Sequence, residues 1–407
     1  VQQRKGDRAG QQFIAITDPG SSLETLAHAH HFRHIFPGVR DIGGRYSALS
    51  NFGIVPAAIM GINVKHLLGR AERMRHSCDA CIHAKENPGV ALGVALAELT
   101  RDGRDKLTLL TSPSLHPLGA WIEQLVAEST GKEGKGLIPI HDEPLGSPKQ
   151  YGQDRVFIYL HHQGDLVPSD PTTGLVAAGY PVIRIDVPDL LNLGEEFFRW
   201  EMATAVAGAL LELNAFDQPN VQESKDNTSF LLESYQQNGS LPADDPCLTQ
   251  EGLQLYVDPV NAQDLSRGTI TQVLSDHLAR IRPGDYVAIN AYLPRTDLIH
   301  RALQDIRVTI RNRYGVATTL GYGPRFLHST GQLHKGGPNT GIFFHLTADD
   351  DKDLKIPGEP YTFGVLKTAQ AQGDFRCLTT HRRRIVRLHL GRDILGGLQR
   401  VEKFLQL

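Results

Sequence analysis

The sequence predicts an α/β protein with mainly parallel sheets. Short runs rich in β-branched and aromatic residues alternate with longer amphipathic stretches along most of the 407 residues, and this alternation is typical of βαβ units. Glycine, proline and aspartate flank the short runs, as expected of turns that connect strands to helices. A hydrophobic content of 40% is sufficient for a large core and for more than one domain.

The expected elements follow from these patterns. Strands are predicted at 13–17, 106–111, 136–140, 155–160, 181–187, 285–293, 316–322, 341–346 and 384–390. Helices are predicted at 53–70, 89–100, 119–130, 194–213, 296–314 and 362–372. The polar segment between 226 and 268 is interpreted as a linker or a large excursion between two α/β units.

Composition excludes several classes of partner and cofactor. The 42 basic and 45 acidic side chains give a net charge of -3, which offers no general attraction for nucleic acid or an anionic membrane. No apolar run approaches the ~20 residues that span a bilayer. Cys78 and Cys81 form a CxxC, but no strand precedes it and no second CxxC accompanies it, so we expect thiols without a redox or metal role. We expect no metal and no cofactor.

Four polar motifs carry the chemistry. The first, DIGGRYSALSNFG at 41–53, places two glycines before Arg45, so that the backbone can approach a ligand and the guanidinium can stabilise an anion. Taken alone, the GGR triplet would be only a turn, whereas the full string is far more specific. In the second, at 119–136, Gln124 and Glu128 share one face of a helix that stops at Gly131. A carboxylate in such a place can act as a general base, whereas the alternative is a solvated surface glutamate.

The third and fourth motifs contain further cations and histidines. NAFDQPNVQESK at 214–225 ends in Lys225, and GYGPRFLHSTGQLHKGGPNTG at 321–341 contains His328, His334 and Lys335. A glycine-rich turn with such side chains is suited to sugar hydroxyls or phosphate. Before the third motif, the string GQDRVFIYLHHQG holds Asp154, His161 and His162.

Together these strings resemble the phosphoglucose (glucose-6-phosphate) isomerase family from residue 12 onward. The first motif is similar to the family's first signature, the E-S-T-G-K string at 128–132 to the segment of the catalytic base, and Phe216, Asp217, Gln218, Val221 and Lys225 to the second signature. Two residues depart from that signature, Asn220 in place of glycine and Gln222 in place of glutamate. The order of the histidine-containing strings also differs from the family's common order. It looks closer to the order in the isomerase portion of fused bacterial transaldolase–isomerase proteins and in short bacterial isomerases.

The resemblance implies a role for each site residue. The catalytic set is the base Glu128, Lys225 at the ring oxygen, His334 as the ring-opening histidine in preference to His161 or His162, and Arg45 beside the developing anion. Substrate binding is expected at Gly43, Gly44, Ser47, Gln124 and Lys335.

The implied reaction is the interconversion of glucose 6-phosphate and fructose 6-phosphate through a cis-enediol, without metal or cofactor, by a cytoplasmic enzyme. The hexose 6-phosphate is the expected partner, with neither nucleic acid nor membrane, and a transaldolase domain fused upstream is compatible with the resemblance. A non-catalytic sugar-phosphate-binding module and an inactive fragment remain as alternatives. Glu128 argues against the former, since such a module has no need of a base.

The resemblance also implies a domain organisation with three-layer αβα sugar-isomerase (SIS) domains. Residues 1–100 are expected to complete a first SIS domain and 101–225 to form a second, followed by the linker or excursion at 226–268 and a C-terminal α/β unit at 269–407. The family's G-x-G-G-S turn and its Ser/Thr-rich phosphate loop do not occur before residue 41. We therefore expect a chain that begins partway through the first SIS domain.

Overall fold

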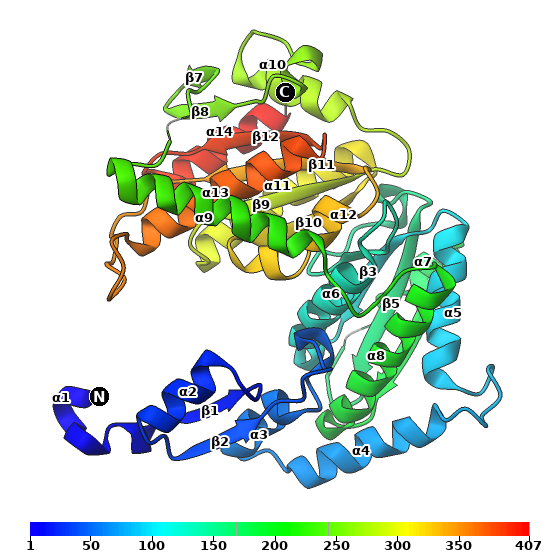
Figure 1. Ribbon diagram of the computed structural model, residues 1–407. Helices are drawn as coiled ribbons and strands as arrows, with labels where there is room; N and C mark the ends of the chain where they lie inside the picture. Colours follow the sequence, from blue (N-terminus) through cyan, green and yellow to red (C-terminus); the bar gives the residue numbers. More distant parts are fainter. Residues whose placement is uncertain (168, 243, 407) are drawn as a thin grey trace. The chain divides into compact units, whose positions relative to one another are not determined.

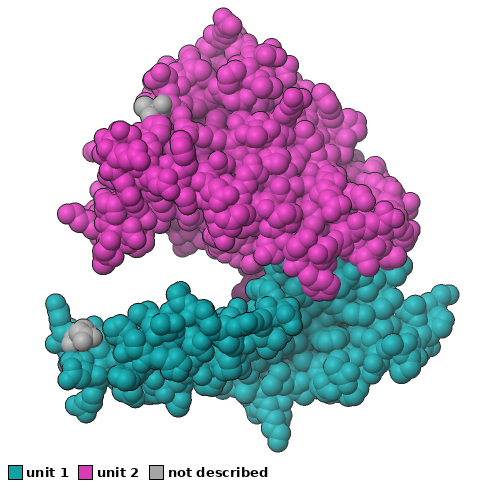
Figure 2. Space-filling view, viewed as in Figure 1, with its two compact units in different colours: residues 1–95, 162–164, 187–206 teal, residues 96–161, 165–186, 207–407 magenta. Residues whose placement is uncertain are grey.

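The computed structural model describes residues 1–167, 169–242 and 244–406. The chain divides into two compact units (Figure 2). Unit 1 contains residues 1–95, 162–164 and 187–206, and unit 2 contains residues 96–161, 165–186 and 207–407. Each unit is described by itself below.

Unit 1 is built on a small parallel sheet and several helices. Strands β1 (Ile14–Thr17) and β2 (His34–Pro37) pair in parallel, with α2 (Ser22–Ala29) as the crossover between them. The other helical elements are α1 (Gln2–Lys5), η1 (Gly6–Arg8), η2 (Gly10–Gln12), η3 (Gly44–Tyr46), α3 (Asn51–Ile59), α4 (Val64–Ser77), η6 (Leu190–Asn192), most of α5 (Pro88–Arg101) and the greater part of α8 (Leu193–Leu210).

The first sheet of unit 2 has four strands in the order β4-β3-β5-β6. The strands are β3 (Lys106–Thr111), β4 (Ile138–Ile140), β5 (Arg155–His162) and β6 (Val182–Val187). The helices along this part of the chain are η4 (Pro113–Leu115), α6 (His116–Thr130), η5 (Pro148–Gln150) and α7 (Thr173–Ala177). The β3 strand pairs in parallel with both β4 and β5, and its carboxyl end leads through η4 into α6.

The second sheet of unit 2 has six strands in the order β10-β9-β11-β12-β8-β7 (Figure 1). Its parallel strands are β9 (Tyr286–Tyr292), β10 (Ala317–Tyr322), β11 (Gly341–Thr347) and β12 (Arg384–His389), and β7 (Leu248–Gln250) and β8 (Leu253–Tyr256) form an antiparallel edge. The helical elements are α9 (Asn220–Asn238), η7 (Asn261–Asp264), α10 (Ile270–Ala279), α11 (Asp297–Tyr314), η8 (Arg325–His328), α12 (Gly331–Gly336), α13 (Phe363–Thr380) and α14 (Ile394–Gln406).

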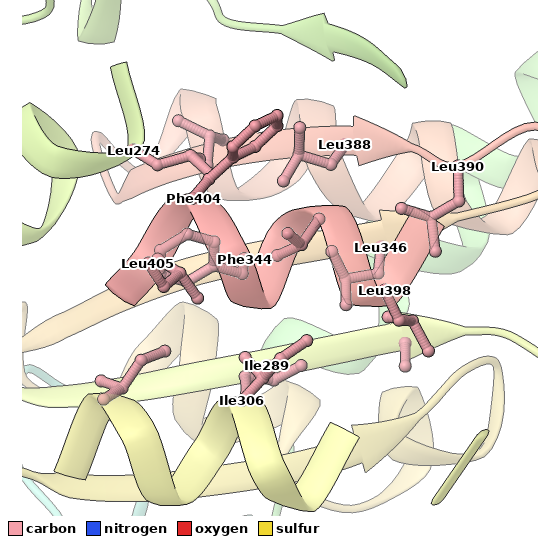
Figure 3. Packing of buried hydrophobic residues seen from close by; sticks show 14 of the residues in the cluster. Leu274, Ile289, Ile306, Phe344, Leu346, Leu388, Leu390, Leu398, Phe404 and Leu405 are labelled. Carbon is pink, nitrogen blue, oxygen red and sulfur yellow. The ribbon is translucent and has the colours of Figure 1, made fainter. Parts of the chain in front are cut away.

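Alternate residues of the six-stranded sheet supply two cores. Ile289 of β9 and Phe344 of β11 point to one face, where they pack with residues of α10, α11 and α14 (Figure 3). On the opposite face, Ala288 and Phe343 pack with residues of α6, α12 and α13. This is the alternation expected of a strand that is buried on both faces. In the second core, α12 packs against α6.

The predicted fold class is confirmed, and two local predictions differ from the structure. The helix expected at 53–70 is broken between α3 and α4, because Gly61 adopts a left-handed conformation (φ +85°) and Asn63 caps α4 by accepting from the N–H of His66. The segment interpreted as a linker or excursion, 226–268, contains most of α9, both strands of the β7–β8 hairpin and η7.

Among the described residues, no helix is both long enough and apolar enough to cross a membrane.

Candidate active site

Three of the four sequence motifs meet in unit 2, where α6 ends. Gln332 of α12 is fully buried, and its Nε2 donates to the carbonyl oxygen of Gly131 over 2.9 Å and to Asn220 Oδ1 over 2.8 Å. The N–H of Asn220 donates in turn to Gln332 Oε1 over 2.9 Å. One side-chain amide therefore links the end of α6, the start of α9 and α12. Asn220, which departs from the family pattern, is part of this link.

A second link is made by Lys132, which lies just after α6. Its side chain is 2% exposed, and Nζ donates to the carbonyl oxygens of Asn214 and Asp217 over 2.5 Å each and to Asp217 Oδ1 over 2.7 Å. A buried ammonium is costly unless such partners satisfy it. Lys132 therefore fixes the turn that precedes α9.

Close backbone approach explains the glycine between these two links. A Cβ atom on Gly131 would lie 2.4 Å from the Cα of Leu333 and 2.6 Å from the carbonyl oxygen of Ala127. Glycine alone permits such contact without displacement of the backbone. The spacing E-S-x-G-K is thus explained locally by the packing of α6 on α12.

Glu128 and Gln124 lie on α6 near this junction. Glu128 is buried, with 8% of its surface exposed, in the last turn of the helix, and Gln124 is half-buried one turn earlier. Their spacing of four residues puts them on the same face of α6. The expected base is therefore a buried carboxylate beside the three joined motifs.

Lys225 and His328 lie within electrostatic range of each other. Lys225 is exposed on α9, and His328 ends the short helix η8, with its imidazole partly buried. This partial burial lowers the pKa of His328, and the positive charges of Lys225 and Lys335 lower it further. His328 is therefore neutral at pH 7 and able to accept a proton.

Replacing Lys225 by Met is expected to raise the pKa of His328. The variant removes one of the two cations that lower this pKa, while the burial of the ring is unchanged. Two-dimensional NMR titration of the histidine rings measures the shift, and His116, which forms an ion pair with Asp142, serves as an internal reference. An unchanged pKa at His328 would show that the two side chains do not interact.

The sequence is similar to those of curated glucose-6-phosphate isomerases. A glucose-6-phosphate isomerase from Parabacteroides distasonis is 28% identical over 268 residues, which covers 56% of this chain and 59% of that protein. One from Rubrobacter xylanophilus is 32% identical over 226 residues, covering 46% of this chain and 52% of that protein. The chain is therefore similar to glucose-6-phosphate isomerases over about half its length. It spans somewhat more than half the length of these isomerases.

Two further comparisons concern the fold. The crystal structure of a hypothetical protein from Thermus thermophilus superposes with a TM-score of 0.51 at 21% identity, covering 56% of this chain and 65% of that one. At this identity the likeness extends to the fold only. No family model matches the chain.

Two residues expected at the isomerase site are enclosed in the core. His334 is 2% exposed, and its ring packs against Tyr286, Phe326 and Phe343. Burial lowers its pKa to about 3, so it is neutral and has no open path to a substrate. Lys335 forms an ion pair with Asp374 over 2.6 Å, and both side chains are 1% exposed. Both side chains are therefore buried, and the ring-opening role of His334 and the substrate-binding role of Lys335 stay predictions.

His161 and Asp154 lie beside charged partners rather than in an aromatic core. His161 Nδ1 lies 3.0 Å from Asp186 Oδ1, and His162 is the last residue of β5. Asp154 forms an ion pair of 3.3 Å with Lys106, whose side chain is fully buried. Asp154 therefore neutralises a buried lysine.

Sequence reasoning missed the special environment of Glu123. This carboxyl group is buried on α6, and burial raises its pKa to about 7, although Arg307 and Arg325 oppose the shift. A group that titrates near neutrality is a candidate for acid–base chemistry. Nothing in the local sequence indicates this environment, because the burial of Glu123 depends on segments that are distant in the sequence. Glu143 differs, since it is paired with Arg155 over 3.0 Å.

The residues of the first motif belong to unit 1. Arg45 is buried in η3, with its guanidinium 5.8 Å from the centroid of the Tyr46 ring. Ser47 Oγ donates to the carbonyl oxygen of Gly44 over 2.7 Å. A Cβ atom on Gly43 or Gly44 would meet nothing within 4 Å. Open space therefore surrounds the backbone of the double glycine.

The two thiols of the CxxC differ in their exposure. Cys78 is buried and Cys81 is exposed. Burial raises the pKa of Cys78, which is opposite to the shift that a reactive thiol requires.

Cys377 belongs to a group of possible metal ligands that no sequence motif predicted. Glu223 of α9 lies with Cys377 and His381, and their ligand atoms are all within 4.8 Å of one another. Carboxylate, thiolate and imidazole are all ligands that Zn²⁺ accepts. Glu223 Oε2 and His381 Nε2 already form a 2.8 Å ion pair, so the present contacts also have a simple structural explanation.

Proposed function

We propose that the protein interconverts glucose 6-phosphate and fructose 6-phosphate. The supporting observation is that Gln332 and Lys132 join the segment of Glu128 to the segment that leads to Lys225, in a chain related to glucose-6-phosphate isomerases. The resemblance to fused proteins extends the proposal to a transaldolase domain upstream.

The proposed reaction begins with opening of the sugar ring. One group must protonate the ring oxygen while another removes the proton of the anomeric hydroxyl. We assign Lys225 to the ring oxygen and His328, which is neutral and at the surface, to the hydroxyl proton. His334 is not assigned to this step because aromatic rings enclose it.

The isomerisation itself moves one proton between neighbouring carbons. Glu128 takes the proton from C2 of the open-chain aldose, and the electron pair of the broken C–H bond forms the C1–C2 double bond of an enediolate with its negative charge on O1. The proton of the C2 hydroxyl moves to O1, and the same carboxyl group returns its proton to C1 as the C2 carbonyl forms. Arg45 is proposed to stabilise the enediolate, on the strength of its motif alone. Gly43, Gly44, Ser47 and Gln124 remain proposed substrate contacts for the same reason.

Isomerase activity is expected to persist in excess EDTA. A single carboxylate can carry out both proton transfers, so the proposed chemistry requires no metal. The natural full-length protein is assayed with fructose 6-phosphate and a coupled dehydrogenase that detects glucose 6-phosphate. Loss of all activity in EDTA, restored by a divalent ion, would contradict the proposed mechanism. Absence of activity with and without metal would contradict the proposed function.

The metal-compatible group supplies a control for this assay. Cys377→Ser removes the thiolate from the group of Glu223, Cys377 and His381 and leaves Glu128 and Lys225 in place. If EDTA acts only by stripping a structural ion from this group, the variant should show the same loss of activity without chelator.

A further inference from the structure

Two neighbouring helices of unit 2, α9 and α13, bring three possible metal ligands together. Cys377 and His381 are four residues apart at the carboxyl end of α13, so their side chains lie on one side of this helix. Glu223 approaches them from the first turn of α9. The thiol sulfur, an imidazole nitrogen and a carboxylate oxygen all lie within 4.8 Å of one another. Three different donors therefore converge from two segments that are far apart in the sequence.

The separations of these atoms are close to those around a tetrahedral Zn²⁺ ion. Zn²⁺ binds sulfur at about 2.3 Å and nitrogen or oxygen at about 2.0–2.2 Å, which places neighbouring ligand atoms about 3.4–3.6 Å apart. Glu223 Oε2 and His381 Nε2 are 2.8 Å apart, so they need to separate by roughly 0.6 Å. The sulfur of Cys377, which is within 4.8 Å of both, needs to approach by at most about 1.3 Å. Small rotations of the Glu223 and His381 side chains produce such shifts.

The chemistry of the donors indicates which ion they would bind. Mg²⁺ and Ca²⁺ take oxygen ligands, so a sulfur ligand disfavours both, whereas thiolate, imidazole and carboxylate together are typical of Zn²⁺. The thiolate and the carboxylate carry two negative charges, which neutralise a divalent cation. Binding displaces the proton of the Cys377 thiol to solvent. Lys335 lies within electrostatic range of this thiol, but it already forms an ion pair with Asp374 over 2.6 Å.

The group is closed on one side and open on the other. Cys377 is fully buried between the helices, whereas the side chains of His381 and Glu223 are 31% and 36% exposed. An ion can therefore enter from solvent on the side of the carboxylate and the imidazole. With three protein ligands in place, a water molecule on this open side would complete the tetrahedron.

Helix α9 is the element that such an ion would stabilise most. Its sequence is polar, and its buried residues are Ser224 and Leu231, so it has little apolar surface of its own to hold it in place. Most of the stability of a helix in a protein comes from packing of an apolar face. An ion bound to Glu223 and to both ligands of α13 would attach the start of α9 directly to the end of α13.

We propose that Glu223, Cys377 and His381 form a Zn²⁺ site that links α9 to α13. The role of the ion is structural, because no step of the proposed isomerisation uses it, and the site is independent of whether the protein is an isomerase. The sequence-based expectation of no metal was drawn from the CxxC at 78–81, which is a different part of the chain. The ligands of the proposed site come from two distant helices, so local spacing could not indicate them.

Titration of the full protein, reduced and freed of metal, with Co²⁺ tests the proposal, because a bond between thiolate and Co²⁺ gives an intense near-ultraviolet absorption band. One Co²⁺ per chain is expected to produce this band, and Zn²⁺ should displace the Co²⁺. Cys377→Ser should abolish the band. Glu223→Gln keeps the thiol and should weaken Co²⁺ binding by at least about 10- to 100-fold, the loss that follows removal of only an outer partner of a metal ligand. The matched controls are Cys81→Ser, at an exposed thiol, and Glu233→Gln, at an exposed position of α9, and both should bind Co²⁺ as the unaltered protein does.

Three outcomes would overturn the proposal. The near-ultraviolet band does not appear with Co²⁺ in excess, or it survives in Cys377→Ser but disappears in Cys81→Ser, which would place the metal at the CxxC, or Glu223→Gln binds Co²⁺ as tightly as the unaltered protein. Thermal melts of each variant identify any loss of binding that is caused by unfolding, and Glu223→Gln leaves the buried thiol in place should Cys377→Ser fail to fold. The melting temperature of the unaltered protein should also rise with the concentration of Zn²⁺.

Discussion

Replacement of Glu128 by Gln is expected to lower kcat for fructose 6-phosphate by about 10²- to 10⁴-fold, the usual effect of removing a general acid–base group. Gln keeps the size of the side chain and its capacity to hydrogen-bond, but it cannot accept the C2 proton. Glu128 is buried in the last turn of α6, and the amide fills the same space. Substrate binding should therefore change much less than turnover.

Proton exchange provides the specific measurement. Exchange of the C2 proton of glucose 6-phosphate with deuterated solvent should fall in parallel with kcat, whereas opening of the ring should continue. Glu133→Gln is the matched control, because Glu133 is exposed five residues further along the chain. Exchange at the unaltered rate in Glu128→Gln would assign the base elsewhere. Glu123, with its pKa near 7, would be tested next, followed by Glu143.

Replacement of Asp374 by Asn is expected to reduce the free energy of unfolding by about 3–5 kcal/mol, because it leaves the buried ammonium of Lys335 without its counter-ion. The two charged groups are 2.6 Å apart, and His345 Nε2 lies 3.3 Å from the second carboxylate oxygen. Burial would raise the pKa of Asp374, but Lys335 and His345 outweigh it and hold the pKa well below its usual range.

The depressed pKa also gives the sign of the pH dependence. A carboxyl group with a lower pKa in the folded state contributes its full stability above the unfolded pKa of about 3.9. That contribution is lost as pH falls through the acid range. Asp374→Asn should therefore lose the most stability, relative to the unaltered protein, near neutral pH and less below pH 4.

Urea unfolding at several pH values measures both effects. Glu98→Gln, which breaks the exposed pair with Arg101, is the control and should change stability little. The double variant Lys335→Met, Asp374→Leu should recover much of the loss, since both charges are removed together. A small effect of Asp374→Asn alone would show that water or another group satisfies Lys335.

Local sequence patterns predicted most of the elements that the sheets contain. The apolar run at 106–111 is β3 without any change of bounds, and the pattern at 296–314 is α11, capped by Thr296 and ended by Gly315 in a left-handed conformation. Helix α9 was missed because its sequence is polar. Only Ser224 and Leu231 are buried in it, and it is held by packing against α13 rather than by its own amphipathic pattern.

The candidate site was predictable only in part. The string at 128–132 predicted a helix end at Gly131, and its resemblance to the isomerase segment implied a base at Glu128. Nothing in the string indicated that Gln332, about two hundred residues further on, would donate to Gly131. The aromatic rings around His334 could not be predicted from the sequence either, because His334 lies on α12 whereas Tyr286 and Phe343 come from strands β9 and β11.

By itself, the sequence predicted the α/β class from its periodicity. Its short strings of fixed spacing indicated a resemblance to glucose-6-phosphate isomerases, and that resemblance implied a set of candidate site residues. The tertiary structure alone decided which of those residues are accessible. Burial is set by contacts between distant segments, so it placed His334 and Lys335 in the core while His328 stayed at the surface. Contacts between distant segments also raise the pKa of Glu123 by burying it, and they form a cavity at the carboxyl edge of the larger sheet.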